Sequence, residues 1–133
     1  MALVVDTDVA SFLFKKDTRA ALYVPHLSGH MLIMSFQTLA EMELWASSAG
    51  WGARRRQQLA GYMRRYMVQD SSPGLGRRWA EVIDGGRRRG RPVATADAWV
   101  AATALLLDVP LVTHNESHFS SVPGLTVISE KTP

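Results

Sequence analysis

The chain has 133 residues, of which 47% are hydrophobic, and it carries a formal net charge of +3 at pH 7. This length fits a single domain spanning residues 1–133, with enough apolar side chains to form a core. The absence of cysteine excludes disulfide bridges and thiolate metal sites. No apolar run is long enough to span a bilayer, and no signal-peptide pattern is present, so we expect a cytoplasmic protein with no membrane partner.

Short apolar runs alternate with helical patterns along the chain. In chain order we predict strand 2–5, helix 7–14, helix 17–23, strand 31–34, helix 36–47, helix 53–67, strand 68–72, helix 75–89, helix 95–107, strand 111–113 and strand 125–128. Strands separated by helices are typical of an α/β fold with a mostly parallel sheet.

Several residues mark the predicted ends of helices. Ser35 and Thr95 have hydroxyl side chains suited to helix N-caps. Pro25 is expected to stop the second helix, because the residue before a proline disfavours helical geometry. Gly50 and Gly52 are expected to separate the third and fourth helices.

The positive charge is concentrated in the middle of the chain. Residues 54–91 contain eleven Arg against three acids, a net charge of +8, whereas the rest of the chain carries −5. Because the planar guanidinium group of Arg donates two hydrogen bonds to a phosphate, this segment indicates a polyanion partner. A solvated helix face is the alternative explanation for any one cluster.

Three carboxylates stand beside apolar residues that should be buried. Asp6 ends the first strand, Glu41 lies early in the third helix, and Asp97 opens the helix that begins near Thr95. A buried carboxylate is costly unless it is paired, and a hard divalent cation shared by all three would offset that cost. Glu43 points to another side of its helix than Glu41, and we expect Glu41 to face inward. A simpler role for Asp97 is interaction with the helix dipole.

Two further polar groups lie near expected strand ends. Asp8 follows Asp6, and we favour a helix-capping role for it. Asn115 follows the strand 111–113, where it can hold a carboxylate or a water. His114 and His118 have the spacing of two zinc ligands, but the segment is too short to supply the remaining ligands, and we do not favour a zinc site.

Four segments, taken together and in this order, resemble the PIN-domain proteins, and among them the VapC-type ribonuclease toxins of bacterial toxin–antitoxin pairs. They are Val4-Val5-Asp6-Thr7-Asp8-Val9, Thr38-Leu39-Ala40-Glu41-Met42, Thr95-Ala96-Asp97-Ala98-Trp99-Val100-Ala101-Ala102-Thr103-Ala104-Leu105 and Thr113-His114-Asn115-Glu116-Ser117-His118-Phe119. Each segment is weakly diagnostic alone, and the resemblance covers essentially the whole chain.

The resemblance implies a three-layer α/β/α sandwich around a short parallel sheet, and an endonuclease that cleaves RNA. It implies Mg²⁺ or Mn²⁺ held by Asp6, Glu41 and Asp97, a homodimer, and a VapB-type antitoxin that blocks the acidic pocket in a hetero-oligomer. The family often has a fourth acid where this chain has His118, which makes a single-ion site the better expectation. His118, Glu116 and Asp8 remain alternative additional ligands.

The predicted mechanism combines these residues. Asp6, Glu41, Asp97 and Asn115 form the catalytic set, in which Asn115 orients the cluster around the ion. RNA is expected to be held through its backbone by six arginines: Arg54, Arg64, Arg65, Arg87, Arg88 and Arg91. A structured RNA with an exposed loop, such as a tRNA or rRNA, is the expected substrate, because sequence-specific RNA recognition usually requires unpaired bases.

Two other functions fit parts of the pattern. A phosphatase of the haloacid dehalogenase type also begins with a strand and Asp-x-Asp, but it needs a lysine near the phosphate. The lysines of this chain, Lys15, Lys16 and Lys131, lie at the wrong ends of the chain for that role. A PIN-like module that binds RNA without cleaving it is the main alternative.

Overall fold

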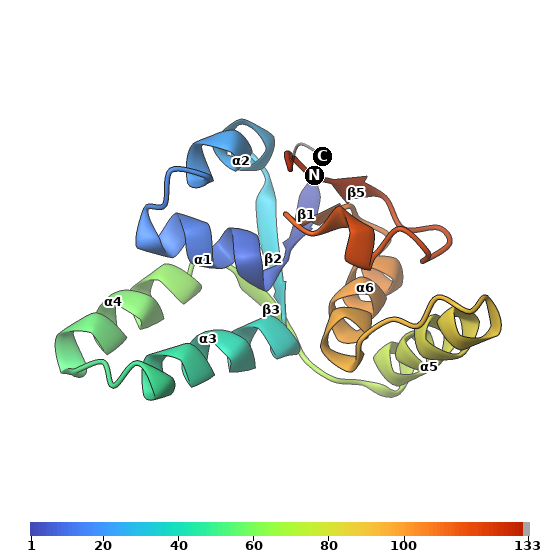
Figure 1. Cartoon of the computed structure of the whole chain (residues 1–133). Coiled ribbons are helices and arrows are strands. Elements are labelled where there is room, and N and C mark those ends of the chain that lie inside the picture. Colours follow the sequence, from blue (N-terminus) through green and yellow to red (C-terminus); the bar gives the residue numbers. More distant parts are fainter. Residues whose placement is uncertain (132–133) are drawn as a thin grey trace.

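The computed structural model describes residues 1–131, and it shows a five-stranded parallel sheet between two layers of helices (Figure 1). The strands are β1 (Ala2–Val5), β2 (Met31–Ser35), β3 (Met67–Gln69), β4 (Leu111–Val112) and β5 (Val127–Ile128), in the spatial order β3-β2-β1-β4-β5. The helices are α1 (Thr7–Lys15), α2 (Ala20–Leu27), α3 (Phe36–Ser48), α4 (Ala53–Met63), α5 (Pro73–Arg88) and α6 (Thr95–Leu107), with a short 3₁₀ helix η1 (Glu116–His118). The predicted α/β/α sandwich is therefore confirmed.

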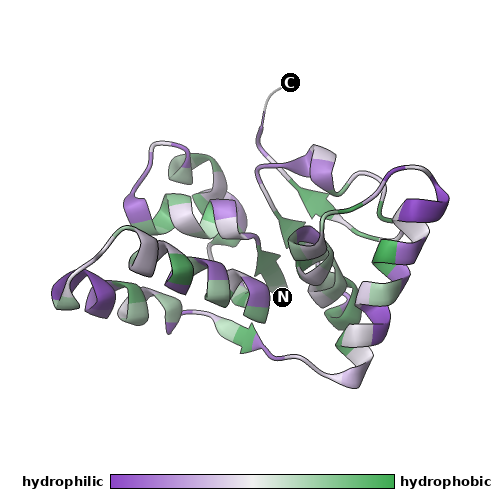
Figure 2. Ribbon diagram, turned by 60° about the horizontal axis from the view of Figure 1, so that its bottom comes forward, coloured by the Kyte–Doolittle hydropathy of each residue, from purple (hydrophilic) through white to green (hydrophobic). Residues whose placement is uncertain are grey.

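The central strand β1 separates two hydrophobic cores. Leu3 and Val5 pack with residues of α1 to α4, whereas Val4 packs on the opposite face with residues of α5 and α6. This division follows from the alternation of side chains along a strand. Figure 2 shows the apolar residues along the strands and on the inner helix faces, with polar residues outside. Among the described residues, no helix is both long and apolar enough to cross a membrane.

The parallel register brings several chain segments to one edge of the sheet. Val5 pairs with Val112, and β2 ends at Ser35, from which α3 begins. Strands β1, β2 and β4 thus end close together, at the edge where open parallel sheets bind their ligands.

The predicted ends of two helices were wrong. The second helix runs from Ala20 to Leu27 with Pro25 inside it, two residues from its end, so Pro25 does not stop it. The fourth helix ends at Met63 instead of Met67, because Met67 pairs with Ile33 as the first residue of β3. Helical spacing of the apolar residues extends over this junction, but strand pairing determines the structure there.

The predicted N-caps had different outcomes. The Ser35 hydroxyl accepts a hydrogen bond from the Thr38 backbone N–H at 3.0 Å, as expected of an N-cap. Thr95 is the first residue of α6, and Ala94 occupies the N-cap position without a side-chain hydrogen bond. The capping prediction was correct for Ser35 and one residue off for Thr95.

Candidate active site

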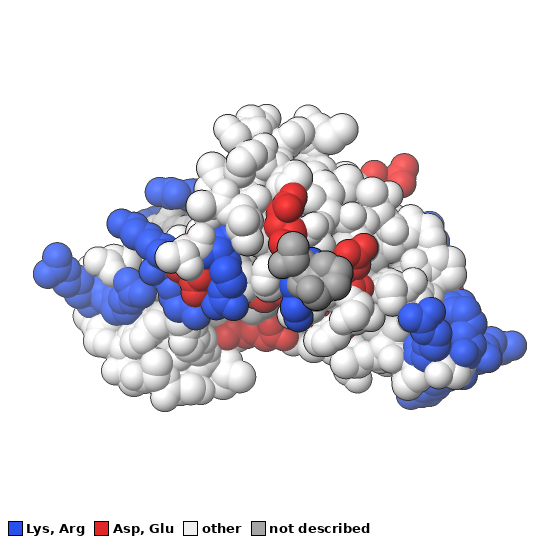
Figure 3. Space-filling view, turned by 45° about the horizontal axis from the view of Figure 1, so that its top comes forward, with Lys and Arg blue, Asp and Glu red and all other residues white. Residues whose placement is uncertain are grey.

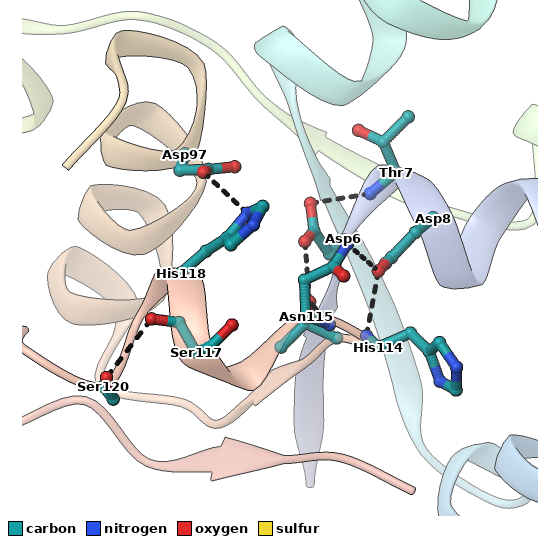
Figure 4. A network of polar contacts seen from close by, with 10 residues as sticks. Asp6, Thr7, Asp8, Asp97, His114, Asn115, Ser117, His118 and Ser120 are labelled. Carbon is teal, nitrogen blue, oxygen red and sulfur yellow. Dashed lines mark hydrogen bonds and ion pairs between the residues drawn. The ribbon is translucent and has the colours of Figure 1, made fainter. Parts of the chain in front are cut away.

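Asp6 lies at the end of β1, where it caps α1 and is almost fully buried, with 7% of its surface exposed. Its Oδ1 accepts a hydrogen bond from the Thr7 backbone N–H at 2.8 Å, and its Oδ2 accepts one from the Thr113 hydroxyl at 2.8 Å (Figure 4). Two hydrogen bonds leave about half of the lone-pair positions of the carboxylate free. Asp6 is therefore held in place and can still bind a cation.

The pKa of Asp6 is raised to about 7, mainly by burial and also by the charges of Asp8 and Asp97, whereas the hydrogen bonds from Thr113 and Thr7 oppose the rise. Desolvation disfavours the charged form, and neighbouring carboxylates disfavour it again. The ionised site therefore carries repulsion that a bound cation would relieve.

Asp8 does not cap the helix, contrary to the role that we favoured for it. The cap is Asp6, and Asp8 sits in the first turn of α1 with its carboxylate directed to the loop after β4. Its Oδ1 accepts from the Val9 N–H at 2.7 Å, and its Oδ2 accepts from the backbone N–H of His114 at 2.9 Å and from Asn115 Nδ2 at 3.0 Å. These bonds occupy most of its acceptor positions and join α1 to that loop.

Asn115 holds a carboxylate, one of the two roles considered for it. Its side chain donates to Asp8, and its backbone N–H donates to Thr113 Oγ1 at 3.1 Å. Thr113 in turn donates to Asp6. The segment after β4 thus orients both aspartates of the Asp-x-Asp pair.

Glu41 and Asp97 come from the two helices that flank this edge, α3 and α6. Glu41 is half-buried, whereas Glu43 is exposed, as predicted. Gln37 Nε2 donates to Glu41 Oε1 at 3.0 Å. Burial raises the pKa of Asp97, and the charges of Glu41 and Asp8 raise it too, while contact with His118 lowers it. The four acids of the site therefore influence one another.

His118 contacts Asp97 directly. Its Nδ1 lies 3.2 Å from Asp97 Oδ2, and the imidazole is more exposed than the carboxylate. At the position of the fourth acid, this chain therefore places a group that can donate a hydrogen bond to Asp97. Glu116, the other candidate ligand in this loop, is exposed at the start of η1.

His114 and His118, whose spacing resembles that of two zinc ligands, contact different residues. The His114 ring packs edge-on against Phe12 at 5.3 Å, and its Nδ1 contacts the Tyr23 hydroxyl. The two imidazoles thus serve different neighbours. This arrangement agrees with the exclusion of a two-histidine zinc site.

The residues suit a hard cation in charge and chemistry. Within residues 1–131, Asp6, Asp8, Glu41 and Asp97 form no ion pair with Lys or Arg. Over the same range, no group of three or more His, Asp or Glu side chains is arranged so that it could hold a metal ion as it stands. Asp6, Glu41 and Asp97 keep free acceptor positions, whereas those of Asp8 are largely used. The first three are the better candidate ligands.

A cleft of about 410 Å³ opens beside Asp97. It is lined by Arg91, Pro92, Ala94, Asp97, Ser117, His118 and Ser121. Arg91 Nη2 donates to the Ser120 hydroxyl at 3.1 Å, which holds the guanidinium group at the cleft. The cleft thus places the cationic side chain of Arg91 and the acidic side chain of Asp97 in one lining.

The other five predicted RNA-binding arginines lie outside this cleft. Arg54 belongs to α4, and Arg64 and Arg65 follow its last turn. Arg87 and Arg88 end α5, where Arg88 pairs with Asp84 at 2.7 Å. Figure 3 shows Lys and Arg gathered at both flanks of the molecule, with acidic residues between them.

Sequence reasoning assigned no role to Thr113, although it joins Asp6 to Asn115. Thr7 and Thr38, whose hydroxyl oxygens are 3.0 Å apart, form a second polar link between α1 and α3. A buried threonine ending an apolar strand was the available signal, since a buried hydroxyl needs a partner.

Comparison with known proteins gives one family match and several structural relatives. The model of the PIN domain family matches residues 3–125. Two curated relatives, both named ribonuclease VapC1 and from Haemophilus influenzae strains R2866 and 86-028NP, are 35% identical over 48 residues. That segment is 36% of this chain and 34% of each relative, so the match spans about a third of their length.

Solved structures resemble the whole chain. A VapBC2 structure from Rickettsia felis, bound to a DNA fragment from their promoter, has a TM-score of 0.85 at 19% identity and covers 98% of this chain and 100% of that one. The VapBC-1 structure from nontypeable Haemophilus influenzae has a TM-score of 0.76 at 25% identity, with 97% and 98% covered. FitAcB from Neisseria gonorrhoeae has a TM-score of 0.81 at 18% identity, with 96% of each chain covered.

Proposed function

The chain belongs to the PIN-domain family, and from that premise we propose that it is a divalent-metal-dependent endoribonuclease and the toxin of a toxin–antitoxin pair. The observation that carries the proposal is the convergence of Asp6, Asp8, Glu41 and Asp97 on the carboxyl edge of the sheet, where burial, and after it the charges of neighbouring acids, raises the pKa of Asp6 and Asp97. A cluster of this kind suits Mg²⁺ or Mn²⁺. The name of the curated relatives, ribonuclease VapC1, supports RNA as substrate.

In this proposal, Asp6, Glu41 and Asp97 would hold the cation. When bound, the ion neutralises charge on the phosphoryl oxygens and lowers the pKa of a water. The protein orients the carboxylates: Thr113 donates a hydrogen bond to Asp6, and Asn115 donates one to Asp8. In-line attack of a water molecule on the phosphorus would break the bond to the 3′ oxygen and leave a 5′-phosphate and a 3′-hydroxyl.

Arg91 would hold the RNA backbone at the cleft. It is the cation that lines the cleft next to Asp97, and its hydrogen bond to Ser120 reduces its freedom before RNA binds. Contacts of this type bind phosphate without reading bases. Recognition of sequence would then depend on unpaired bases in a structured RNA such as a tRNA or rRNA.

A cognate antitoxin would regulate the enzyme. Structural relatives include VapBC structures, two of them bound to DNA, which supports a VapB-type partner for this chain. We also propose a homodimer that forms a hetero-oligomer with the antitoxin. An RNA substrate would place the protein in the cytoplasm.

One observation favours the non-catalytic alternative. His118 occupies an oxygen of Asp97 that a metal could otherwise use. If this contact persists, the chain would bind RNA through its arginines and leave it intact. The proposed enzyme would bind the cation through Oδ1 of Asp97, or through Oδ2 once His118 moves away from it.

Purified protein incubated with total RNA tests the proposal. We expect cleavage in Mg²⁺ or Mn²⁺ and none in EDTA, with RNA 5′ ends that map to a few unpaired sites. Cleavage that survives EDTA would contradict the metal mechanism. RNA binding without cleavage in either metal would support the non-catalytic module.

A further inference from the structure

A second cavity, of about 390 Å³, lies at the far end of α1 from the carboxylates. Four cationic side chains line it, and we call it the α1–α4 basic pocket: Lys15, Lys16, Arg55 and Arg65, with Gln58 and Tyr62 among the other lining residues. Among the described residues, none that line it carries a carboxylate. The pocket therefore presents concentrated positive charge without an internal counter-charge.

Aromatic rings, instead of carboxylates, position two of these cations. The Arg55 guanidinium lies over Phe14 at 4.4 Å and over Trp51 at 5.0 Å, and its Nη1 donates to Gln58 at 3.2 Å. Lys15 lies over the ring of Trp45 at 5.3 Å. Cation–π contacts fix a side chain without neutralising its charge, so both groups stay available to an anion.

The nearest acid in the sequence is already engaged. Asp17 binds Arg19 through both carboxylate oxygens, at 3.0 Å from Nε and 2.9 Å from Nη2. Both oxygens of Asp17 are thus paired with Arg19, and Asp17 forms no ion pair with Lys15 or Lys16 among the described residues. Lys16 and Arg65 are exposed, and the described residues give neither side chain a hydrogen bond or ion pair.

We propose that the α1–α4 basic pocket binds the phosphate backbone of RNA away from the cleavage point. This inference rests on the proposed function, since it assigns a second contact to the same substrate. RNA placed over Asp6 and Asp97 meets repulsion from the acidic centre, so cations on the flank are needed to hold it. Figure 3 shows such a basic flank on the side of the molecule opposite α5.

The length of α1 sets the spacing between the two contacts. Asp6 caps its first turn and Lys15 is its last residue, and nine residues at about 1.5 Å each span roughly 13 Å. A strand of a nucleic-acid duplex advances on the order of 3 Å per nucleotide, so the pocket lies about four or five nucleotides from the carboxylates. This distance suits the backbone of a stem next to the cleaved loop, because such a backbone continues from the cleavage point past the pocket.

The test compares two pairs of charge-removing substitutions in an Asp6→Asn background, which prevents cleavage during binding. The pocket pair is Lys16→Gln with Arg65→Gln, and the matched control is Arg77→Gln with Arg89→Gln on the opposite flank. Affinity for a fluorescent hairpin RNA with a stem of about ten base pairs is measured from 50 to 300 mM salt. Melting temperatures of both pairs verify that the fold is intact.

We expect the double variant of the pocket to bind RNA about tenfold more weakly at low salt. The slope of log affinity against log salt should become shallower by about 1.5, because each lost phosphate contact lowers its magnitude by about 0.7 to 0.9. The control pair should change both quantities much less. Equal losses in the two pairs, or none, would overturn the proposal. So would unchanged RNA affinity combined with lost binding of a poly-glutamate peptide.

A cleavage assay on the chain with Asp6 intact separates the proposed enzyme activity from the proposed RNA-binding role of the pocket. RNA cleavage in Mg²⁺ together with pocket-independent binding would overturn the pocket and leave the enzyme. Pocket-dependent binding without cleavage would overturn the proposed enzyme and support the pocket.

Discussion

Replacing Asp6 with Asn should stabilise the metal-free protein at neutral and basic pH. The buried carboxylate has a pKa of about 7, against an ordinary value of 3.8, because desolvation and neighbouring acids disfavour its ionised form. Asn has the same shape and can keep both contacts: its Oδ1 accepts from the Thr7 N–H, and its amide can donate to the Thr113 hydroxyl. The substitution therefore removes the charge with little change in packing.

The sign and size of the effect follow from linkage between protonation and folding. A pKa that is raised on folding contributes stability below pH 4, and this contribution is lost as the pH rises toward 7. The rise in pKa from 3.8 to about 7 corresponds to about 4 kcal/mol at pH 8 and to less than about 2 kcal/mol at pH 5. Relaxation of the site reduces these values, so we expect Asp6→Asn to gain about 2 kcal/mol at pH 8.

Chemical denaturation in EDTA at pH 5 and pH 8 measures the difference. Asp108→Asn, at an exposed position with a left-handed backbone that Asn tolerates, is the matched control and should show no gain. An advantage of Asp6→Asn that fails to grow between pH 5 and pH 8 would refute the assignment of a costly buried charge to Asp6. A loss of stability at pH 8 would refute it more strongly.

Three other substitutions test separate parts of the account. His118→Glu should increase Mn²⁺ affinity several-fold, because it frees Asp97 Oδ2 and adds a carboxylate beside the site; unchanged or weaker binding in isothermal titration calorimetry would contradict this. Asn115→Ala should cost about 1–3 kcal/mol of unfolding free energy and reduce RNA cleavage at least tenfold, because Asp8 loses an oriented donor; unchanged cleavage kinetics would argue against the orienting role. Gly86→Ala should lower the melting temperature, because its Cβ would stand 2.9 Å from a backbone carbonyl of the α5–α6 loop, whereas at Gly85 it meets only a flexible side chain. Equal melting temperatures for the Gly86→Ala and Gly85→Ala variants would contradict the packing argument.

The order of strands and helices could be predicted because each element carries its own periodicity. Apolar runs such as residues 2–5 fix buried strands, and Ser35 marks the start of α3 by local hydrogen bonding. The end of α4 could not be predicted in this way. Met67 continues the helical spacing of apolar residues, and only its pairing with Ile33, far away in sequence, assigns it to a strand.

The acidic edge could be anticipated because parallel strands end on the same side of a sheet, which places Asp6 near the residues that follow Ser35 and Val112. The contacts between side chains at this edge could not be anticipated from the sequence. The bond from Asn115 to Asp8 and the approach of His118 to Asp97 depend on the path of an irregular loop. Capping was assigned to Asp8, although a helix that begins at Thr7, as predicted, has Asp6 at its N-cap position.

The central claim is that Asp6 belongs to a cation site that cleaves RNA. It is tested most directly by single-turnover cleavage of a mapped RNA substrate in Mg²⁺, with wild type and Asp6→Asn compared at equal fractions of bound RNA. We predict that Asp6→Asn binds this RNA as tightly as wild type, or more tightly, and that its cleavage rate falls at least 100-fold. Cleavage by Asp6→Asn at the wild-type rate would contradict the account.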